Sequence, residues 1–323
     1  SANRKLVMRA GELRIRNSFP SNYSAPYFTA GLINFFGSGA ASVPTNITTP
    51  AVLQYNKLEL SGNRSGNVTF PSNGQIKVAD SLRISNLTFS STTYKFLTSG
   101  STVIFNKNGG NQYIPIKPAS PADTSAYLNY HNLVLDSTGN KFLKDTGTPF
   151  YEVKGNLTIR NTATFDLNGF NLAVEGNWIN QDAGSIFVPG TKTVLMRSPV
   201  TAATTNITSR DTTQNPFYDL VVSGKGIVKP NDELKIRNNF RIDSASTLLQ
   251  QATNVTLNGN WLNYKGEAHF YTILPNGTLR SEDIYLDNEK ELYQSFLYQN
   301  DSIIMKKWDK GFLGFLLKSS MFW

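Results

Sequence analysis

The 323-residue chain contains no cysteine and only two histidines. Without cysteine, neither a disulfide bond nor a thiolate metal site can stabilise the fold. His131 and His269 stand in neither a metal-ligand nor a triad-like spacing, so we expect no metal and no other cofactor. No run approaches the roughly 18 apolar residues of a membrane-spanning helix. These absences argue against small cross-linked secreted domains, zinc enzymes and proteins with a transmembrane segment.

A nine-residue pattern instead returns four times along the chain. Each copy reads as a short strand, a three-residue corner and a second short strand. The leading residue and the first apolar residue of the second strand are six positions apart in every copy. A fixed spacing held over most of a chain predicts a stacked array rather than one closed enzyme fold. The copies cover residues 7–15, 76–84, 151–159 and 234–242.

Other elements recur around this pattern. An aromatic residue stands three positions before a leucine upstream of three of the copies, at Tyr55/Leu58, Tyr130/Leu133 and Phe217/Leu220. Both Leu157 to Trp178 and Phe240 to Trp261 span 21 residues, which predicts that each pair lies on adjacent coils with its side chains inward. Further strands are expected at 32–37, 101–106, 191–196 and, weakly, 277–282.

Short Val-, Ile-, Thr- and aromatic-rich strands between Gly, Asn, Asp and Ser corners predict an all-β chain, since no sustained helical period occurs before about residue 285. Spacings of about 20 residues per coil favour a parallel β-solenoid over a barrel or an array of sandwiches. Alternation places Leu82 and Ile84 inside and Arg83 outside. The repeated asparagines fit corners at which left-handed backbone is tolerated and stacked amides bond to one another.

The chain has a net charge of +8, and its tail from Ser281 onward is net negative, so the positive charge belongs to the repeats. Basic residues at outward strand positions are expected to form one basic face if the strands stack. Such a face is a solvated exterior or a binding surface for an anionic polysaccharide or lipopolysaccharide, with an affinity that falls as salt rises. Nucleic acid is not expected, because exposed aromatics and binding motifs are lacking. The residues of this candidate face are Arg14, Arg16, Lys77, Arg83, Arg160, Lys235, Arg237 and Arg241.

The GNWIN and GNWLN coils, the YHNLVL and FYDLVV strands and the GTKTVLM element resemble the repetitive right-handed parallel β-helix proteins that Bacteroidota export to their surface, often by type IX secretion. The resemblance covers about residues 5 to 280. It implies a right-handed parallel β-helix and an adhesin-like or stalk-like role, in an extracellular or outer-surface location. The chain opens SANRKLVM without a signal peptide, which suggests a mature form or a fragment.

The tail departs from the repeat. We expect a solenoid domain over residues 1–284 and a divergent C-terminal cap or docking segment over residues 285–323. Asp287 is placed to cap a helix that carries Leu292, Tyr293, Phe296 and Leu297. Such a cap would cover the open end of the last coil, and the apolar run 311–323 would otherwise dock on a neighbouring subunit or a lipid surface.

Enzyme signatures are few. A β-helix polysaccharide lyase or glycoside hydrolase needs clustered carboxylates with a basic residue nearby. The acidic pairs Asp232/Glu233 and Glu282/Asp283 instead occupy a turn and the fading end of the repeat, with no stack of Asp on neighbouring coils. We therefore predict a non-enzymatic adhesin, stalk or structural filament component, with the β-helix lyase or hydrolase as the alternative.

Overall fold

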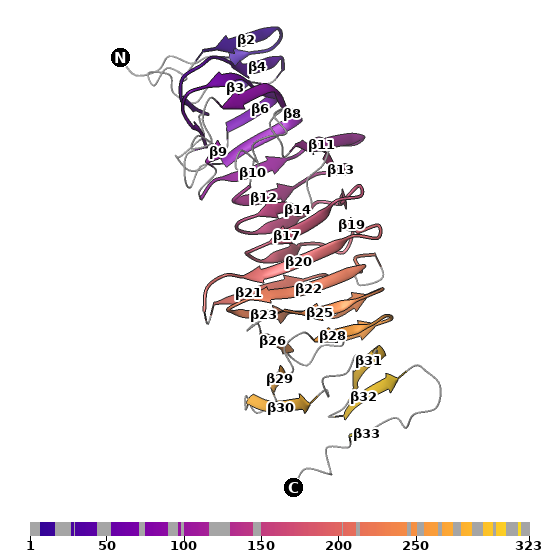
Figure 1. Cartoon of the computed structure of the whole chain (residues 1–323). Helices are drawn as coiled ribbons and strands as arrows, with labels where there is room; N and C mark the ends of the chain where they lie inside the picture. Colours follow the sequence, from indigo (N-terminus) through magenta and orange to yellow (C-terminus); the bar gives the residue numbers. More distant parts are fainter. Residues whose placement is uncertain are drawn as a thin grey trace. The chain divides into compact units, whose positions relative to one another are not determined.

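A computed structural model shows an all-β chain in which parallel strands stack as a β-solenoid (Figure 1). This confirms the predicted fold class. The structure describes residues 7–16, 27–28, 30–43, 53–70, 75–89, 96–97, 100–115, 130–144, 150–201, 203–210, 214–243, 247–250, 255–263, 267–273, 279–285, 293–299, 302–307 and 316–317. The chain divides into two compact units, Ser1–Asn168 and Gly169–Trp323, and we describe each by itself.

In the first unit, one long sheet is parallel throughout, because each coil contributes one strand beside the strand of the preceding coil. Its strands are β2 (Glu12–Ile15), β4 (Leu32–Phe35), β6 (Leu53–Arg64), β8 (Gln75–Phe89), β10 (Thr102–Phe105), β12 (Asn132–Leu135) and β15 (Leu157–Ile159). The shorter strands are β1 (Val7–Met8), β3 (Tyr27–Phe28), β5 (Ala41–Ser42), β7 (Val68–Thr69), β9 (Phe96–Leu97), β11 (Asn111–Pro115), β13 (Gly139–Lys144), β14 (Phe150–Val153) and β16 (Ala163–Asp166).

The second unit repeats this arrangement with two longer sheets. One comprises β18 (Trp178–Asn180), β21 (Thr204–Thr208), β23 (Ile227–Pro230), β26 (Thr247–Gln250), β29 (Glu267–Ile273) and the antiparallel β30 (Leu279–Tyr285). The other comprises β17 (Asn171–Val174), β20 (Thr193–Ser198), β22 (Asp219–Gly224), β25 (Phe240–Ile242) and β28 (Trp261–Asn263). The remaining strands are β19 (Ile186–Val188), β24 (Leu234–Ile236), β27 (Val255–Leu257), β31 (Tyr293–Gln299), β32 (Ser302–Lys307) and β33 (Leu316–Leu317).

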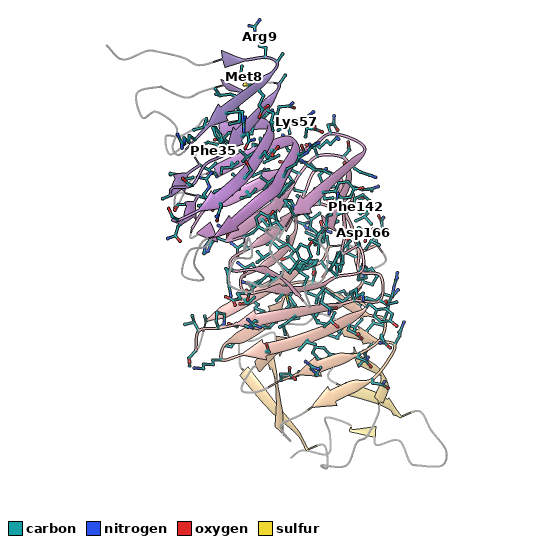
Figure 2. All side chains as sticks on the ribbon, turned by 45° about the horizontal axis from the view of Figure 1, so that its top comes forward. Met8, Arg9, Phe35, Lys57, Phe142 and Asp166 are labelled. Carbon is teal, nitrogen blue, oxygen red and sulfur yellow. The ribbon has the colours of Figure 1, made fainter. Side chains whose placement is uncertain are left out.

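The core of each unit is built from side chains that alternate inward along these short strands. Leu82 is buried and Arg83 is exposed, as predicted, whereas the side chain of Ile84 lies outside the described residues. Phe35, labelled in Figure 2, is fully buried. In the second unit the Trp178 ring packs 4.7 Å from Phe187 and 5.1 Å from Phe217, centroid to centroid. Trp178 therefore fills the core.

The predicted strand, corner and strand are confirmed in three of the four copies, as β1–β2, β14–β15 and β24–β25. The second copy differs, because β8 continues through its corner as one strand. The pairing of β6 with β8 slips there, since Tyr55 faces Val78 but Lys57 faces Ser81. The predicted corner is thus a bulge inside one longer strand. The residues on both sides of this bulge pair with the long strand β6.

The aromatic-x-x-Leu segment and the strand-corner-strand copy that follows it lie side by side. The aromatic residue pairs with the end of the first strand, and the leucine pairs with the start of the second. Between these paired positions the earlier coil has two residues and the later coil has three, and these three residues are its predicted corner. The pairs are Tyr55 with Val78 and Leu58 with Leu82, Tyr130 with Val153 and Leu133 with Leu157, and Phe217 with Ile236 and Leu220 with Phe240.

The 21-residue spacing is confirmed in the second unit, where Phe240 and Trp261 pair in parallel register. The side chain of Trp261 lies outside the described residues. Asparagine amides bond between coils as predicted: Asn260 Nδ2 donates to Asn239 Oδ1 at 3.1 Å, and Asn206 Nδ2 donates to Asn177 Oδ1 at 3.3 Å. The GNW asparagine Asn177 does not have the left-handed backbone that we expected.

The predicted helix in the tail is wrong. Tyr293–Gln299 is the strand β31, and it pairs antiparallel with β32. A short segment with several apolar residues can form either a helix or a strand. Here the pairing with the neighbouring strand Ser302–Lys307 makes it a strand. Strand β31 approaches β27 of the repeat. The assignment of residues 285–323 as a cap stays a prediction, and most of residues 311–323 lie outside the described part.

Candidate functional site

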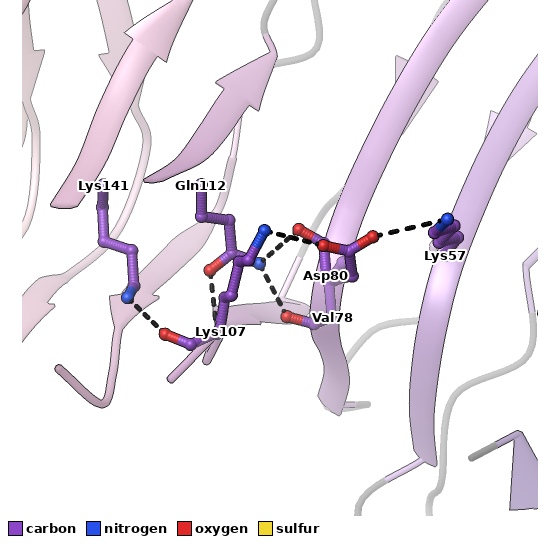
Figure 3. A network of polar contacts seen from close by, with 6 residues as sticks. All are labelled: Lys57, Val78, Asp80, Lys107, Gln112 and Lys141. Atoms are coloured by element: carbon purple, nitrogen blue, oxygen red, sulfur yellow. Dashed lines mark hydrogen bonds and ion pairs between the residues drawn. The ribbon is translucent and has the colours of Figure 1, made fainter. Parts of the chain in front are cut away.

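A group of polar side chains links successive coils of the first unit (Figure 3). Asp80, in the bulge of β8, holds its carboxylate 2.9 Å from Lys107 Nζ and 3.7 Å from Lys57 Nζ. These three side chains are about one-third to two-fifths exposed, so solvent weakens both ion pairs. We call Lys57, Asp80, Lys107, Gln112 and Lys141 the corner network.

Gln112 forms the buried centre of the corner network (Figure 3). Its Nε2 donates to the carbonyl oxygens of Val78 at 2.9 Å and Asp80 at 3.2 Å. Its Oε1 accepts the backbone N–H of Lys107 at 3.0 Å. The amide thereby binds backbone groups at the β8 bulge, where the carbonyl of Val78 also accepts the N–H of Asn106 at 3.1 Å. Gln112 fixes the shape of this corner.

Lys141 is fully buried beneath the same corner. Its ammonium donates to the carbonyl oxygens of Lys107 at 2.8 Å, Thr138 at 3.1 Å and Ser137 at 3.3 Å. Burial lowers the pKa of Lys141 to about 8, with Asp136 opposing this shift and Lys107 adding to it. The carbonyl oxygens match the three donors of an ammonium group, so Lys141 closes a turn rather than facing a ligand.

Asp136 is the buried carboxylate next to this corner. Arg160 donates to its Oδ2 from Nε at 3.0 Å and from a terminal nitrogen at 2.8 Å, and Asn161 donates to its Oδ1 at 2.8 Å. Burial would raise the pKa of Asp136, but the hydrogen bonds from Asn161 and Arg160 and the charges of Arg160 and Lys77 outweigh it and lower the pKa. The carboxylate is therefore ionised and fully engaged.

The structure brings together two residues of the predicted basic face, Lys77 and Arg160, around Asp136. It distributes the others differently. Arg14 lies on β2, 3.7 Å from Glu12 and over the ring of Phe36, and Arg16 is exposed just after that strand. Arg83 is exposed on β8 and faces Glu59 of β6 in register. Acidic and amide side chains thus interrupt the row of arginines.

In the second unit, Lys235 lies on β24, Arg237 is the first residue of the corner between β24 and β25, and Arg241 lies on β25. Lys235 and Arg241 are half-buried, and Arg237 is exposed. Arg241 donates to Asp243 at 2.9 Å, which neutralises much of its charge locally. One of the three predicted basic side chains of this unit, Arg241, is therefore already paired with a carboxylate.

The acidic and histidine candidates serve backbone roles where the structure describes them. Asp232 accepts the backbone N–H groups of Ser209 at 2.7 Å and Arg210 at 2.6 Å, and so holds the left-handed turn at Arg210. The carbonyl of His131 accepts the N–H of Gly155 at 2.6 Å. The side chains of Glu282, Asp283 and His269 lie outside the described residues. Within the described residues, no cluster of three or more His, Asp or Glu could hold a metal ion.

Sequence reasoning missed Lys57, Lys107 and Lys141, as well as Asp80 and Asp136. Lys57 occupies the position before the leucine of the aromatic-x-x-Leu segment, but that position is Asn132 or Asp219 in the other copies, so the repeat does not mark it as a cation. The other four stand in corners or outside the recurring elements, where no periodic signal marks them. Only the stacking of coils brings residues about 25 to 35 positions apart into one cluster, as in the bond between Gln112 and Val78. The available signal is a charged residue directly after a predicted strand, as at Lys107 and Asp136.

Comparison of the chain with protein-family models, curated proteins and solved structures finds no significant match. The structure supports the resemblance to exported β-helix proteins at the level of the fold. The bacterial group and the secretion route stay predictions. Among the described residues, no helix is long and apolar enough to cross a membrane. The function has to be argued from the side chains themselves.

Proposed function

We propose that the chain is a non-enzymatic β-solenoid that acts as an adhesin, stalk or filament component at a bacterial surface. One observation carries this proposal: three carboxylates of the described coils, Asp136, Asp219 and Asp232, are engaged in holding adjacent coils together. Asp136 binds Arg160 and Asn161, Asp232 binds two backbone N–H groups, and Asp219 binds the side chain of Asn238 and the N–H of Asn239.

This use of carboxylates argues against general acid/base chemistry. A general acid needs a raised pKa, whereas the pKa of Asp136 is lowered by its donors. A general base needs to be oriented toward the substrate, whereas the carboxylate of Asp232 is directed at the backbone N–H groups of Ser209 and Arg210. A β-helix lyase or hydrolase stays the alternative, and its activity is an outcome of the test below.

The surface around the corner network is the best candidate for ligand contact. The cations there are Lys57, Lys77, Lys107, Lys141 and Arg160, against the carboxylates Asp80 and Asp136. Lys141 is buried, but Lys57 and Lys107 keep 42% and 35% of their side chains exposed. The local excess of positive charge favours an anionic polysaccharide through long-range attraction that salt screens.

Retention on immobilised alginate and polygalacturonate tests this proposal. The variant Lys57→Ser, Lys77→Ser, Lys107→Ser should elute at clearly lower salt than the unchanged chain. A matched variant, Lys192→Ser, Lys225→Ser, Lys229→Ser, removes the same charge from the second unit and should elute close to the unchanged chain. Equal losses in both variants would mean that net charge alone attracts the polymer, which contradicts a localised contact.

The same polymers separate a binding module from an enzyme. Incubation with alginate, polygalacturonate and chondroitin sulfate should release no unsaturated or reducing ends. Product release that is abolished by Asp136→Asn or Asp232→Asn would overturn the non-enzymatic proposal in favour of the lyase or hydrolase. The surface location is tested separately, by labelling intact cells that express the chain with an antibody against it.

A further inference from the structure

Among the described residues, no strand pairs with the outer edge of β2, the first strand of the long sheet in the first unit. Within the described part of the chain, β2 pairs with β4 alone, and it is the terminal strand of the sheet. The N–H groups of Leu32 and Phe36 donate to the carbonyls of Gly11 and Ile15 at 2.8 Å. Because backbone groups alternate sides along a strand, the N–H and C=O groups of Glu12 and Arg14 point away from β4.

The core is also incompletely covered at this edge. Leu13 is half-buried, whereas Ile33 and Leu58, its neighbours in register on β4 and β6, are fully buried. The corner glycines show the same difference. A Cβ built on Gly31 would lie 2.5 Å from the carbonyl oxygen of Gly11, but a Cβ built on Gly11 would meet no atom within 4 Å. Figure 2 labels Met8 and Arg9 beside this first coil.

The charges along β2 are complementary to those of the same strand turned around. Glu12 and Arg14 flank Leu13 on the outward face, with 45% and 59% of their side chains exposed, and their mutual distance within the chain is 3.7 Å. In an antiparallel pair centred on Leu13, Glu12 faces Arg14 of the second copy, and Arg14 faces Glu12. Opposite charges directly across a strand pair stabilise it, and like charges destabilise it.

The hydrogen-bond pattern fits the same register. Residues that face each other across an antiparallel pair must both direct their backbone groups at the partner or both away from it. Glu12 and Arg14 both direct theirs outward, so they form hydrogen-bonded pairs, and Leu13 meets Leu13 of the second copy as a non-hydrogen-bonded pair. The inward faces of the two sheets then lie on the same side, and the half-buried leucines cover each other.

We propose that two copies of this chain associate through their β2 strands, antiparallel and two-fold symmetric about Leu13. A symmetric interface of this kind closes at a dimer rather than extending into a filament. It also covers an edge that would otherwise invite irregular strand pairing. This proposal is independent of whether the chain binds a polysaccharide.

Charge reversal tests the register. The mass of the full chain in solution should show a concentration-dependent dimer, and Glu12→Arg or Arg14→Glu alone should weaken it about tenfold or more, because each places like charges opposite each other. The double variant Glu12→Arg, Arg14→Glu restores both attractions and should dimerise like the unchanged chain. An equimolar mixture of the two single variants should form heterodimers in preference to homodimers.

A single cysteine gives a second readout. The chain has no cysteine of its own. Non-hydrogen-bonded antiparallel pairs have Cα atoms about 4.5 Å apart, within the range of a disulfide. Leu13→Cys should therefore cross-link to a covalent dimer under mild oxidation, whereas the exposed Ala10→Cys, with about 20 Å between the two copies in this register, should not.

Thermal melts of each variant show whether it remains folded. Three results would overturn the proposal. The first is a chain that stays monomeric at high concentration, and the second is a dimer whose affinity is unchanged by both single charge reversals. The third is an Ala10→Cys variant that cross-links as efficiently as the Leu13→Cys variant. Growth into filaments rather than a dimer would also overturn it, because that requires pairing of β2 with a different surface.

Discussion

The side-chain Oδ1 of Asn132 accepts the backbone N–H of Asn156, on the next coil, at 2.9 Å. Asn156 is the residue just before Leu157, and Asn132 is the residue just before Leu133, so the bond locks the two coils where their second strands begin. Asp219 makes the same contact to the N–H of Asn239 at 2.8 Å. The polar residue before the leucine of the aromatic-x-x-Leu segment thus serves as a corner clamp in both units.

Removal of this clamp should destabilise the first unit. We expect Asn132→Ala to lower the free energy of unfolding by about 1 kcal/mol, because the N–H of Asn156 loses its acceptor. Asn132→Asp keeps an acceptor oxygen, as Asp219 does naturally, and should stay within about 0.5 kcal/mol of the unchanged chain. Urea titrations followed by circular dichroism measure both. Equal losses for the two variants would contradict the clamp.

Trp178 tests the core of the second unit. The indole is 1% exposed and lies among Phe187 and Phe217. Trp178→Ala should cost about 3 to 5 kcal/mol, because truncation leaves a cavity that the stacked strands cannot close. Val200→Ala, at a side chain that is 62% exposed, should change stability by less than about 0.5 kcal/mol. Similar unfolding midpoints for the two variants would contradict the packed core.

Asp136 predicts that the stability difference between the unchanged chain and Asp136→Asn depends on pH in the acidic range. Its folded pKa lies below the ordinary value of 3.8, so its contribution is present above that pH and is lost as the pH falls through the folded pKa. At pH 7, Asp136→Asn should cost about 1 to 3 kcal/mol, because Arg160 loses its carboxylate. The stability curves of the two proteins should converge toward pH 2 in urea titrations. A constant offset down to that pH would show that the charge plays no part.

Lys141 predicts a dependence on pH in the alkaline range, with stability again rising as the pH rises. Its pKa falls from 10.5 to about 8 on folding, so the folded state binds fewer protons than the unfolded state between these values. Relative to Lys141→Met, the unchanged chain should therefore gain about 1 kcal/mol per pH unit as the pH rises from about 8 toward 10. Below pH 8 the full cost of burying the ammonium is present, and the difference between the two proteins should be flat. Parallel curves throughout would contradict a buried, titrating Lys141.

The sequence by itself determined the recurring strands and their order along the coils. Alternation at Leu82 and Arg83 and the recurring step from Phe240 to Trp261 are local signals, because a period of two and a fixed spacing can be recognised without knowing the neighbours. The same signals indicated which residues face inward. The parallel stacking followed from the repeated corner, since strands of equal length with equal corners bury their apolar side chains most simply by stacking.

Only the tertiary structure decided what depends on a neighbouring coil. The long strand β6 makes β8 run through its predicted corner, and pairing with β32 makes Tyr293–Gln299 a strand instead of a helix. The burial of Lys141 and the donors around Asp136 likewise come from coils far apart in sequence. Pairing partners, burial and electrostatic environment are properties of two segments in contact, so no single segment can specify them.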